Sequence, residues 1–208
     1  MSIAQQVYDD FIDGLRVGKY RPGDRVRAED VAKSFAVSRT PVREALSRLQ
    51  ERGLLEMTST GLSVSVLDRT SVLELYAIRE LLEGSAARFA AQHASPSDLF
   101  SMRQIADAFE KCEYDAARVA QLNRAFHGAI YDAAHNKYLF GILAGMHDAL
   151  MLLPSTTFAV QGRQGTAVGE HRAILDAIEA RDPDAADLAA RKHIQHARDT
   201  RLGMMFQY

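Results

Sequence analysis

The 208-residue chain has few of the features that mark secreted, zinc-finger or membrane proteins. Its one cysteine, Cys112, excludes an intramolecular disulfide and a cysteine-rich zinc site. No apolar run approaches the roughly 18 residues that a membrane-spanning helix needs. The amino terminus has no basic segment followed by an apolar stretch, so we expect a cytoplasmic protein without a signal peptide. The net charge of −2 argues against a protein that coats nucleic acid non-specifically.

The residues that are present are unevenly distributed along the chain. The composition, 47% hydrophobic and 25% charged, is that of a globular protein of one or two domains. Between Arg16 and Arg52 there are ten Lys or Arg against five Asp or Glu. All seven histidines follow this basic region. We therefore expect a first part that meets an anionic partner and a second part with a different chemistry.

Residues 28–55 have the pattern of a helix-turn-helix. Thr40 is suited to an N-cap, Pro41 to the first helical position and Gly53 to the left-handed position beyond a helix end. Inside these limits apolar residues recur at helical spacing, on one face. The members of this stripe are Val42, Ala45, Leu46 and Leu49. The stripe is expected to pack on a short preceding helix that carries Val31, Ala32 and Phe35.

The outer face of the second helix carries polar and basic residues. Arg39, Arg43 and Ser47 are one turn apart, and Thr40 lies beside them. Guanidinium groups, hydroxyls and a helix N-terminus are the groups that a DNA major groove accepts. The alternative is an ordinary helical hairpin with a solvated basic end. The coincidence of cap, apolar stripe and clustered arginines favours DNA binding.

The segment Ser38-Arg39-Thr40-Pro41-Val42-Arg43-Glu44-Ala45-Leu46, with Arg48-Leu49 and Gly53-Leu54-Leu55 after it, resembles the signature of the GntR family of bacterial transcription regulators. The resemblance implies a winged helix-turn-helix that binds operator DNA as a homodimer through Arg39, Thr40 and Arg43. Ser38, Ser47 and the wing residue Gly61 complete the predicted DNA-contacting set. Two positions depart from the family pattern: Ala36 replaces the usual turn glycine, and the wing, residues 58–61, has no arginine.

The remaining pattern predicts a mainly α protein with two domains. Two short strands, 54–57 and 62–66, form the wing and close a DNA-binding domain at 1–66. A linker at 67–70 leads to an effector-binding and dimerisation domain at 71–208, an antiparallel six-helix bundle. Ser71 and Glu74 are expected to cap its first helix. The predicted helices are 71–91, a helix that begins at Pro96 and includes Phe109, 115–134, 138–153, 166–180 and 183–201, with a loop at 155–165.

Three histidines of the second domain fall on separate predicted helices. They are His127, His171 and His193, and Asn123 lies one turn before His127. Three imidazoles and one oxygen donor form a site for zinc, nickel, manganese or iron that is open to a further ligand. From spacing alone, a hydrogen-bonded core histidine is the commoner outcome at such positions.

The segments Leu122–His127, Glu170–Ile178 and Ala190–His193 resemble the motifs of the FCD effector domain of the FadR-type GntR subgroup. In that domain the four positions are metal ligands, usually one Asp and three His. The resemblance therefore implies a divalent-metal site at Asn123, His127, His171 and His193, with a neutral amide at the first position. Arg79 matches an arginine often seen near the effector pocket; a salt bridge to Glu83 is the alternative.

These features predict a transcription regulator, a repressor, whose operator affinity is controlled by a small carboxylate at the metal site. One alternative is a metal sensor in which the ion itself is the signal. The other is a metalloenzyme, but the helix of His127 has no His-Glu-x-x-His motif, and the chain has neither a nucleophile elbow nor a phosphate-binding loop. We therefore expect no enzyme activity, and double-stranded operator DNA, an organic acid and a second copy of the chain as partners.

Overall fold

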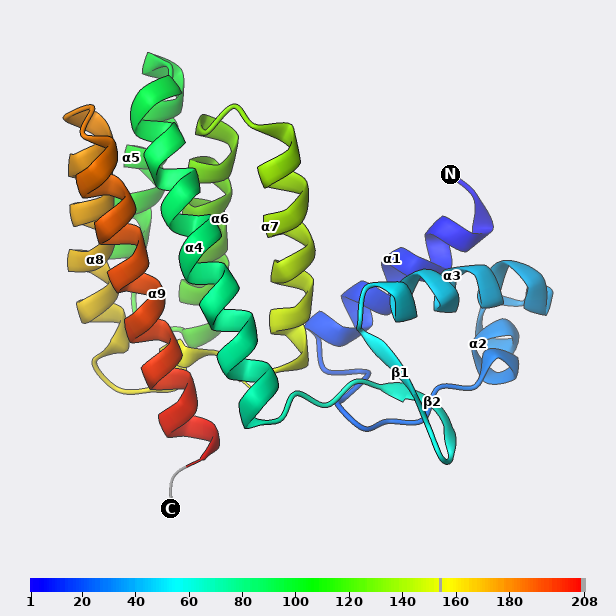
Figure 1. Ribbon diagram of the computed structural model, residues 1–208. Helices are drawn as coiled ribbons and strands as arrows, with labels where there is room; N and C mark the ends of the chain where they lie inside the picture. The colour runs from blue at the N-terminus through cyan, green and yellow to red at the C-terminus, as the bar shows by residue number, and fades with distance from the viewer. Residues whose placement is uncertain (154, 207–208) are drawn as a thin grey trace. The chain divides into compact units, whose positions relative to one another are not determined.

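The computed structural model describes residues 1–153 and 155–206, which form two compact units. The first comprises Met1–Asp68 with Gly145–Pro154, and the second comprises Arg69–Ala144 with Ser155–Tyr208. The first unit combines helices with a small sheet, and the second is helical (Figure 1). The mainly α fold class predicted from the sequence is confirmed.

The first unit is a winged helix-turn-helix. Its two strands pair in antiparallel fashion, with Leu55 opposite Val64, and form the wing (Figure 1). Within the described residues its elements are α1 (Ile3–Arg16), α2 (Ala28–Phe35), α3 (Arg39–Glu51), β1 (Leu55–Thr58) and β2 (Gly61–Val64). The strands predicted at 54–57 and 62–66 are therefore present, displaced by one or two residues.

A hydrophobic core holds the three helices and the wing together. Helix α1 begins where the hydroxyl of Ser2 accepts the N–H of Gln5, and it buries its apolar stripe. The stripe of α3 is fully buried, as predicted, and Val64 of the wing joins the same core. Leu152 also packs in this core, although the sequence placed it in the second domain.

The turn between α2 and α3 contains the expected left-handed residue. Ala36 has φ +52° and ψ +40°, and Gly53 beyond α3 has φ +70°. The prediction that Thr40 caps α3 is wrong, because the helix begins at Arg39 with extended Ser38 at its N-cap. Pro41 then lies within the first turn, where its missing N–H has no intrahelical partner to lose.

The second unit is a bundle of six α-helices whose axes run roughly parallel (Figure 1). The six-helix prediction is thus confirmed for the part of the chain that the structure describes. The helices are α4 (Arg69–His93), α5 (Pro96–Glu110), α6 (Ala116–Ala133), α7 (Lys137–Ala149), α8 (Arg163–Glu179) and α9 (Pro183–Met205). Two short 3₁₀ turns, η1 (Leu150–Leu152) and η2 (Thr157–Ala159), lie between α7 and α8.

Several predicted helix ends are wrong. Helix α4 begins at Arg69 instead of Ser71, because neither glycine nor proline interrupts the chain between them. Helix α8 begins at Arg163 instead of Thr166, since left-handed Gly162 (φ +81°) starts the helix earlier. The helix predicted at 138–153 ends at Ala149 and is followed by a 3₁₀ turn, and Pro154, which follows the predicted end, lies outside the described residues.

Helices α4 and α9 pack closely along each other, and Gly84 lies where α4 meets side chains of α9. A Cβ at Gly84 of α4 would collide with Asp187 and Arg191 of α9. Alanines and larger apolar residues from α4, α5, α6, α7, α8 and α9 fill the core of the bundle. Among the described residues no helix is long and apolar enough to cross a membrane.

The left-handed Ala36 generates a stability prediction. Replacing Ala36 by glycine removes the steric cost of a Cβ at positive φ, so we expect the free energy of unfolding to rise by up to about 1 kcal/mol. The matched control is Ala180→Gly, because Ala180 ends α8 with φ −71° and gains no relief. Urea denaturation measures both; an Ala36→Gly variant no more stable than the parent would contradict the prediction.

Candidate functional site

The first unit presents a basic recognition face built on α3. Arg39, Thr40 and Arg43 are exposed in its first turns, with Ser38 before them and Ser47 one turn further on. Arg39 forms an ion pair with Glu29 at 2.9 Å, and both side chains are about two-thirds exposed. Such an exposed pair contributes little to stability, so Glu29 does not fix the Arg39 side chain strongly.

Two further arginines, which the sequence analysis missed, extend this face. A surface hollow of about 540 Å³ is lined by Arg25 and Arg27 together with Glu29, Arg39 and Arg43. The guanidinium of Arg25 lies about 3.5 Å from where a Cβ of Gly61 would stand. The wing sequence lacks an arginine, but Arg25 therefore places a cation beside its tip. The backbone of Arg25 forms an antiparallel β-bridge with Ser63 of β2.

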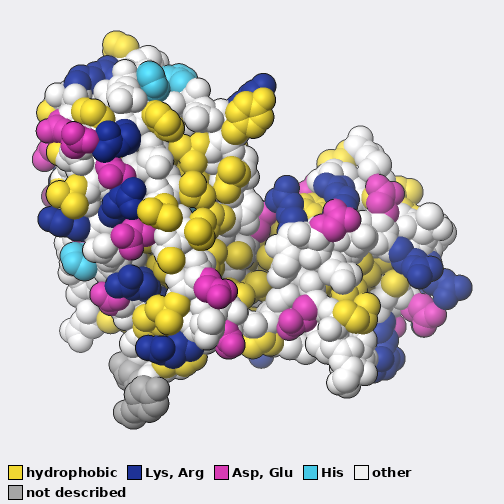
Figure 2. All heavy atoms as spheres, in the orientation of Figure 1, with side chains coloured by type: hydrophobic (Ala, Val, Ile, Leu, Met, Phe, Trp, Pro, Cys, Tyr) yellow, Lys and Arg dark blue, Asp and Glu magenta, His cyan; other side chains and the backbone are white. Residues whose placement is uncertain are grey.

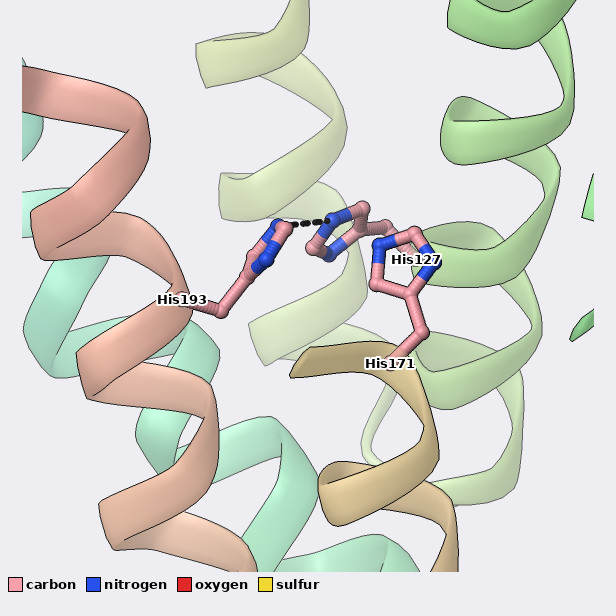
Figure 3. A group of neighbouring side chains, drawn as sticks. All are labelled: His127, His171 and His193. Carbon is pink, nitrogen blue, oxygen red and sulfur yellow. Dashed lines mark hydrogen bonds between the residues drawn. The ribbon is translucent and has the colours of Figure 1, made fainter. Parts of the chain in front are cut away.

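The second unit brings three histidines together inside the bundle. His127 of α6, His171 of α8 and His193 of α9 point toward one another (Figure 3). One nitrogen from each lies within 4.8 Å of the others, and all three side chains are buried. His127 Nε2 and His193 Nε2 are 3.1 Å apart. Three of the four predicted ligand positions thus meet in one place.

Two carboxylates orient this histidine cluster from outside. Glu83 Oε2 lies 2.7 Å from His127 Nδ1, and Glu170 Oε2 lies 2.6 Å from His193 Nδ1. A carboxylate that accepts the Nδ1–H of an imidazole leaves Nε2 with a free lone pair directed at the centre, which is the usual support of a metal-bound histidine. The sequence analysis assigned neither glutamate to the site. Glu170 directly precedes His171, and Glu83 was named only as a partner of Arg79.

The carboxylates are in turn held by arginines and by His196. Arg79 donates to Glu83 Oε1 at 2.9 and 2.6 Å, so the predicted alternative, a salt bridge at i+4, is present in the structure. Arg163 donates to Glu170 Oε2 at 2.8 Å. His196 Nδ1 lies 2.7 Å from Glu170 Oε1. Both glutamates are therefore neutralised by a neighbouring guanidinium.

Burial and neighbouring charges set the protonation of the cluster. Burial lowers the pKa of His171 well below its ordinary value, and the neighbouring His193 and His127 lower it further. Burial also lowers the pKa of His193, to about 4, against the opposing effect of Glu170. Burial alone would raise the pKa of Glu170, but hydrogen bonds from His193 and Arg163 outweigh it and bring the value to about 2. At neutral pH these two imidazoles are uncharged, and Glu170 is ionised.

Among the buried groups that lack a hydrogen-bond partner in the described part of the chain, two are predicted metal ligands. Both ring nitrogens of His171 are buried without a hydrogen bond, although its ring packs on Phe109 and Phe126. The Oδ1 atom of Asn123, one turn before His127 on α6, is also buried without one. Unsatisfied buried polar atoms are costly. A divalent ion between the imidazoles would satisfy a nitrogen of His171, so the residues present fit such an ion.

The Glu170 network generates a second prediction. Replacing Glu170 by alanine leaves the buried Arg163 guanidinium without its counter-charge, so we expect the free energy of unfolding to fall by about 3 kcal/mol. Glu179→Ala is the control, because Glu179 also lies on α8 and pairs with Arg103, but that pair is exposed and should cost less than about 1 kcal/mol. Thermal and urea unfolding measure both variants; equal losses would show that Glu170 has no special structural role.

Comparison with known proteins identifies both units. The family model described as "FCD domain" matches residues 74–196, and the one described as "Bacterial regulatory proteins, gntR family" matches residues 3–61. The probable D-xylose utilization operon transcriptional repressor of Paenarthrobacter nicotinovorans is 31% identical over 203 residues, covering 93% of this chain and 86% of that protein. The uncharacterized regulator YdhC of Bacillus subtilis is 29% identical and covers 92% of this chain and 87% of YdhC.

Solved structures share the fold. McbR/YncC of E. coli superposes with a TM-score of 0.77 at 22% identity, covering 94% of this chain and 95% of that one. A putative GntR regulator from Rhodococcus sp. RHA1 has the same TM-score at 23% identity, covering 98% and 99%. With its recognition helix, wing and histidine-centred bundle, the chain belongs to the gntR family of bacterial DNA-binding transcription regulators, in the group whose second domain is an FCD domain.

Proposed function

We propose that the protein is a metal-dependent repressor whose operator affinity is controlled by a small carboxylate bound in the FCD domain. The observation that carries this proposal is the cluster of three buried imidazoles, two of them oriented by carboxylates. Neutral imidazoles supported in this way are suited to zinc, nickel, manganese or iron. When bound, the ion supplies a coordination position for the oxygen of an acid.

Each residue of the centre has a distinct task in this proposal. His127, His171 and His193 hold the ion, and Asn123 contributes a neutral oxygen from the same helix face as His127. Glu83 and Glu170 fix the ring orientation of His127 and His193 through Nδ1. Arg79 holds Glu83 in place. We therefore propose that Arg79 affects effector binding through Glu83.

Operator recognition is assigned to the basic face of the first unit. Arg39 and Arg43 reach guanine edges or phosphates in the major groove, and Thr40, Ser38 and Ser47 supply hydroxyls around them. The wing approaches the backbone at Gly61, where Arg25 supplies the positive charge that the wing sequence lacks.

A homodimer is supported by an apolar surface on the bundle. Hydrophobic side chains gather on the face that carries α4 and α7 (Figure 2). The exposed ones on these helices are Ile78, Leu81, Tyr138, Phe140 and Ile142. A second copy of the chain covers such a surface and places two recognition helices on a palindromic operator.

The repressor assignment is supported by the printed name of one relative, a probable repressor of a D-xylose utilization operon. The acid acts by differential affinity: it favours one arrangement of the two DNA-binding units in the dimer, and that arrangement fits the operator worse. A metal sensor is the second candidate, because a neutral Asn123 in place of a carboxylate favours reversible metal binding.

DNA recognition is tested at Arg43. We expect Arg43→Ala to weaken binding to DNA from upstream of the protein's own gene by about tenfold or more, because a guanidinium contact to a base is worth roughly 1–3 kcal/mol. Fluorescence anisotropy measures the affinity. Arg103→Ala, on the surface of α5, is the control and should leave it unchanged. Unchanged operator affinity of Arg43→Ala, with the control also unchanged, would remove α3 from the operator interface.

The metal-dependent response needs a separate measurement. We expect the purified protein to contain about one divalent ion per chain, and His171→Ala to lose it, because His171 is one of only three imidazole ligands. His93→Ala, at the end of α4, is the control. Elemental analysis gives the metal content, and anisotropy with a panel of organic acids, with and without chelator, gives the response. Release by one acid that chelator abolishes supports the proposal; a response to metal alone supports the sensor, and no response to either overturns both.

A further inference from the structure

Arg163 has donors that the protein leaves unused. It is the first residue of α8, and it is 6% exposed. One of its terminal nitrogens donates to Glu170, but Nε and NH1 are buried without a hydrogen-bond partner among the described residues. A guanidinium offers five N–H donors in a planar fork, and buried donors without acceptors are costly. The unused donors of Arg163 therefore point to a missing acceptor.

Arg163 lines a surface hollow and is also linked to the histidine cluster through Glu170. It has a volume of about 440 Å³ and is lined by Gly162, Arg163 and Thr166 at the start of α8 and by His196, Asp199 and Thr200 on α9, with Val160 and Gln161 alongside. Arg163 and His196 are both bonded to Glu170, whose Oε2 also contacts His193. A single carboxylate thus joins the wall of the hollow to the ligand cluster.

The start of α8 adds to the attraction for an anion. Gly162 caps the helix without a side chain, so no side chain competes for the N–H groups of the first turn. The hollow also contains a negative charge, Asp199, but Arg198 donates to it at 2.9 Å. Arg163 and the N-terminus of α8 are therefore groups in the lining of the hollow that attract an anion.

The charges of the centre also require an anion. The pairs Arg79–Glu83 and Arg163–Glu170 each cancel. The four proposed ligands are neutral, because imidazole binds metal unprotonated and Asn123 carries no charge. A divalent ion there would leave two buried positive charges uncompensated, which is costly. A ligand with one carboxylate removes half of this excess, and a ligand with two removes all of it.

From these observations we infer that the effector is a short dicarboxylate, one end of which takes the open metal position while the other accepts hydrogen bonds from the unused donors of Arg163. The inference rests on the proposed metal site and extends it to the class of acid. The acid is short in this inference, because Arg163 and His193 both contact the Oε2 atom of Glu170 and so lie close together. Arg163 is then the residue that distinguishes dicarboxylates from monocarboxylates.

Calorimetric titration of the Zn²⁺-loaded full-length protein tests this inference. The probes are two matched pairs of acids, succinate with butyrate and glutarate with valerate. We expect one dicarboxylate to bind about tenfold or more tightly than its matched monocarboxylate, since a charge-assisted hydrogen bond contributes roughly one such factor. Arg163→Lys keeps the charge beside Glu170 but loses the planar fork, so it should reduce this preference about tenfold. Arg103→Lys is the control, because Arg103 also pairs with a glutamate of α8, but on the surface.

The outcomes separate the two proposals. Metal-dependent binding of both acids of a pair with equal affinity would overturn the dicarboxylate inference while leaving the metal-dependent effector site intact. A preference for dicarboxylates that persists unchanged in a folded Arg163→Lys protein would overturn the role of Arg163. Absence of binding by any organic acid to the Zn²⁺-loaded protein would overturn the inference and the effector proposal together. The comparison of acids in the parent protein decides the matter even if Arg163→Lys fails to fold.

Discussion

The carboxylate of Glu170 is the interaction on which the second unit depends. It accepts from Arg163 and His193 inside the bundle and from His196 at its edge. Buried charges are tolerated only when paired and hydrogen-bonded, and here one carboxylate satisfies a guanidinium and fixes an imidazole at once. Glu83 repeats the arrangement on the other side with Arg79 and His127. Each glutamate that orients a histidine is therefore paired with an arginine, and neither pair carries a net charge.

The histidines of the site could be predicted from the sequence, but the glutamate that orients His193 could not. The spacing of His127, His171 and His193 placed them on three helices, but periodicity alone does not say that three of seven histidines meet; the family resemblance identified those three. Glu170 was missed because a residue adjacent to a ligand in a helix faces about 100° away from it, so adjacency gives no contact signal. It reaches the site through His193 of α9 instead.

Arg163 was missed for a different reason. The sequence analysis assigned residues 155–165 to a loop, and a loop arginine is normally solvated. Gly162 starts α8 earlier than the capping pattern indicated, and this places Arg163 inside the bundle. In the first unit the apolar stripe of α3 predicted the core correctly, because burial on one helix face is a local signal. The cation beside Gly61 comes from Arg25, which is distant in sequence, and only the tertiary pairing of Arg25 with Ser63 brings it there.

A ligand at the centre can change DNA binding only if it binds two states of the protein with different affinity. Only a short stretch of the chain separates the wing from the residues that support the histidine cluster. Helix α4 carries Arg79 and Glu83, and it begins at Arg69, only a few residues after β2 of the wing. In the proposed mechanism, a ligand that displaced Glu83 from His127 would act on the helix that begins next to the DNA-binding unit. Helix α7 provides a second connection, because residues 145–149 belong to the first compact unit while the helix begins in the second.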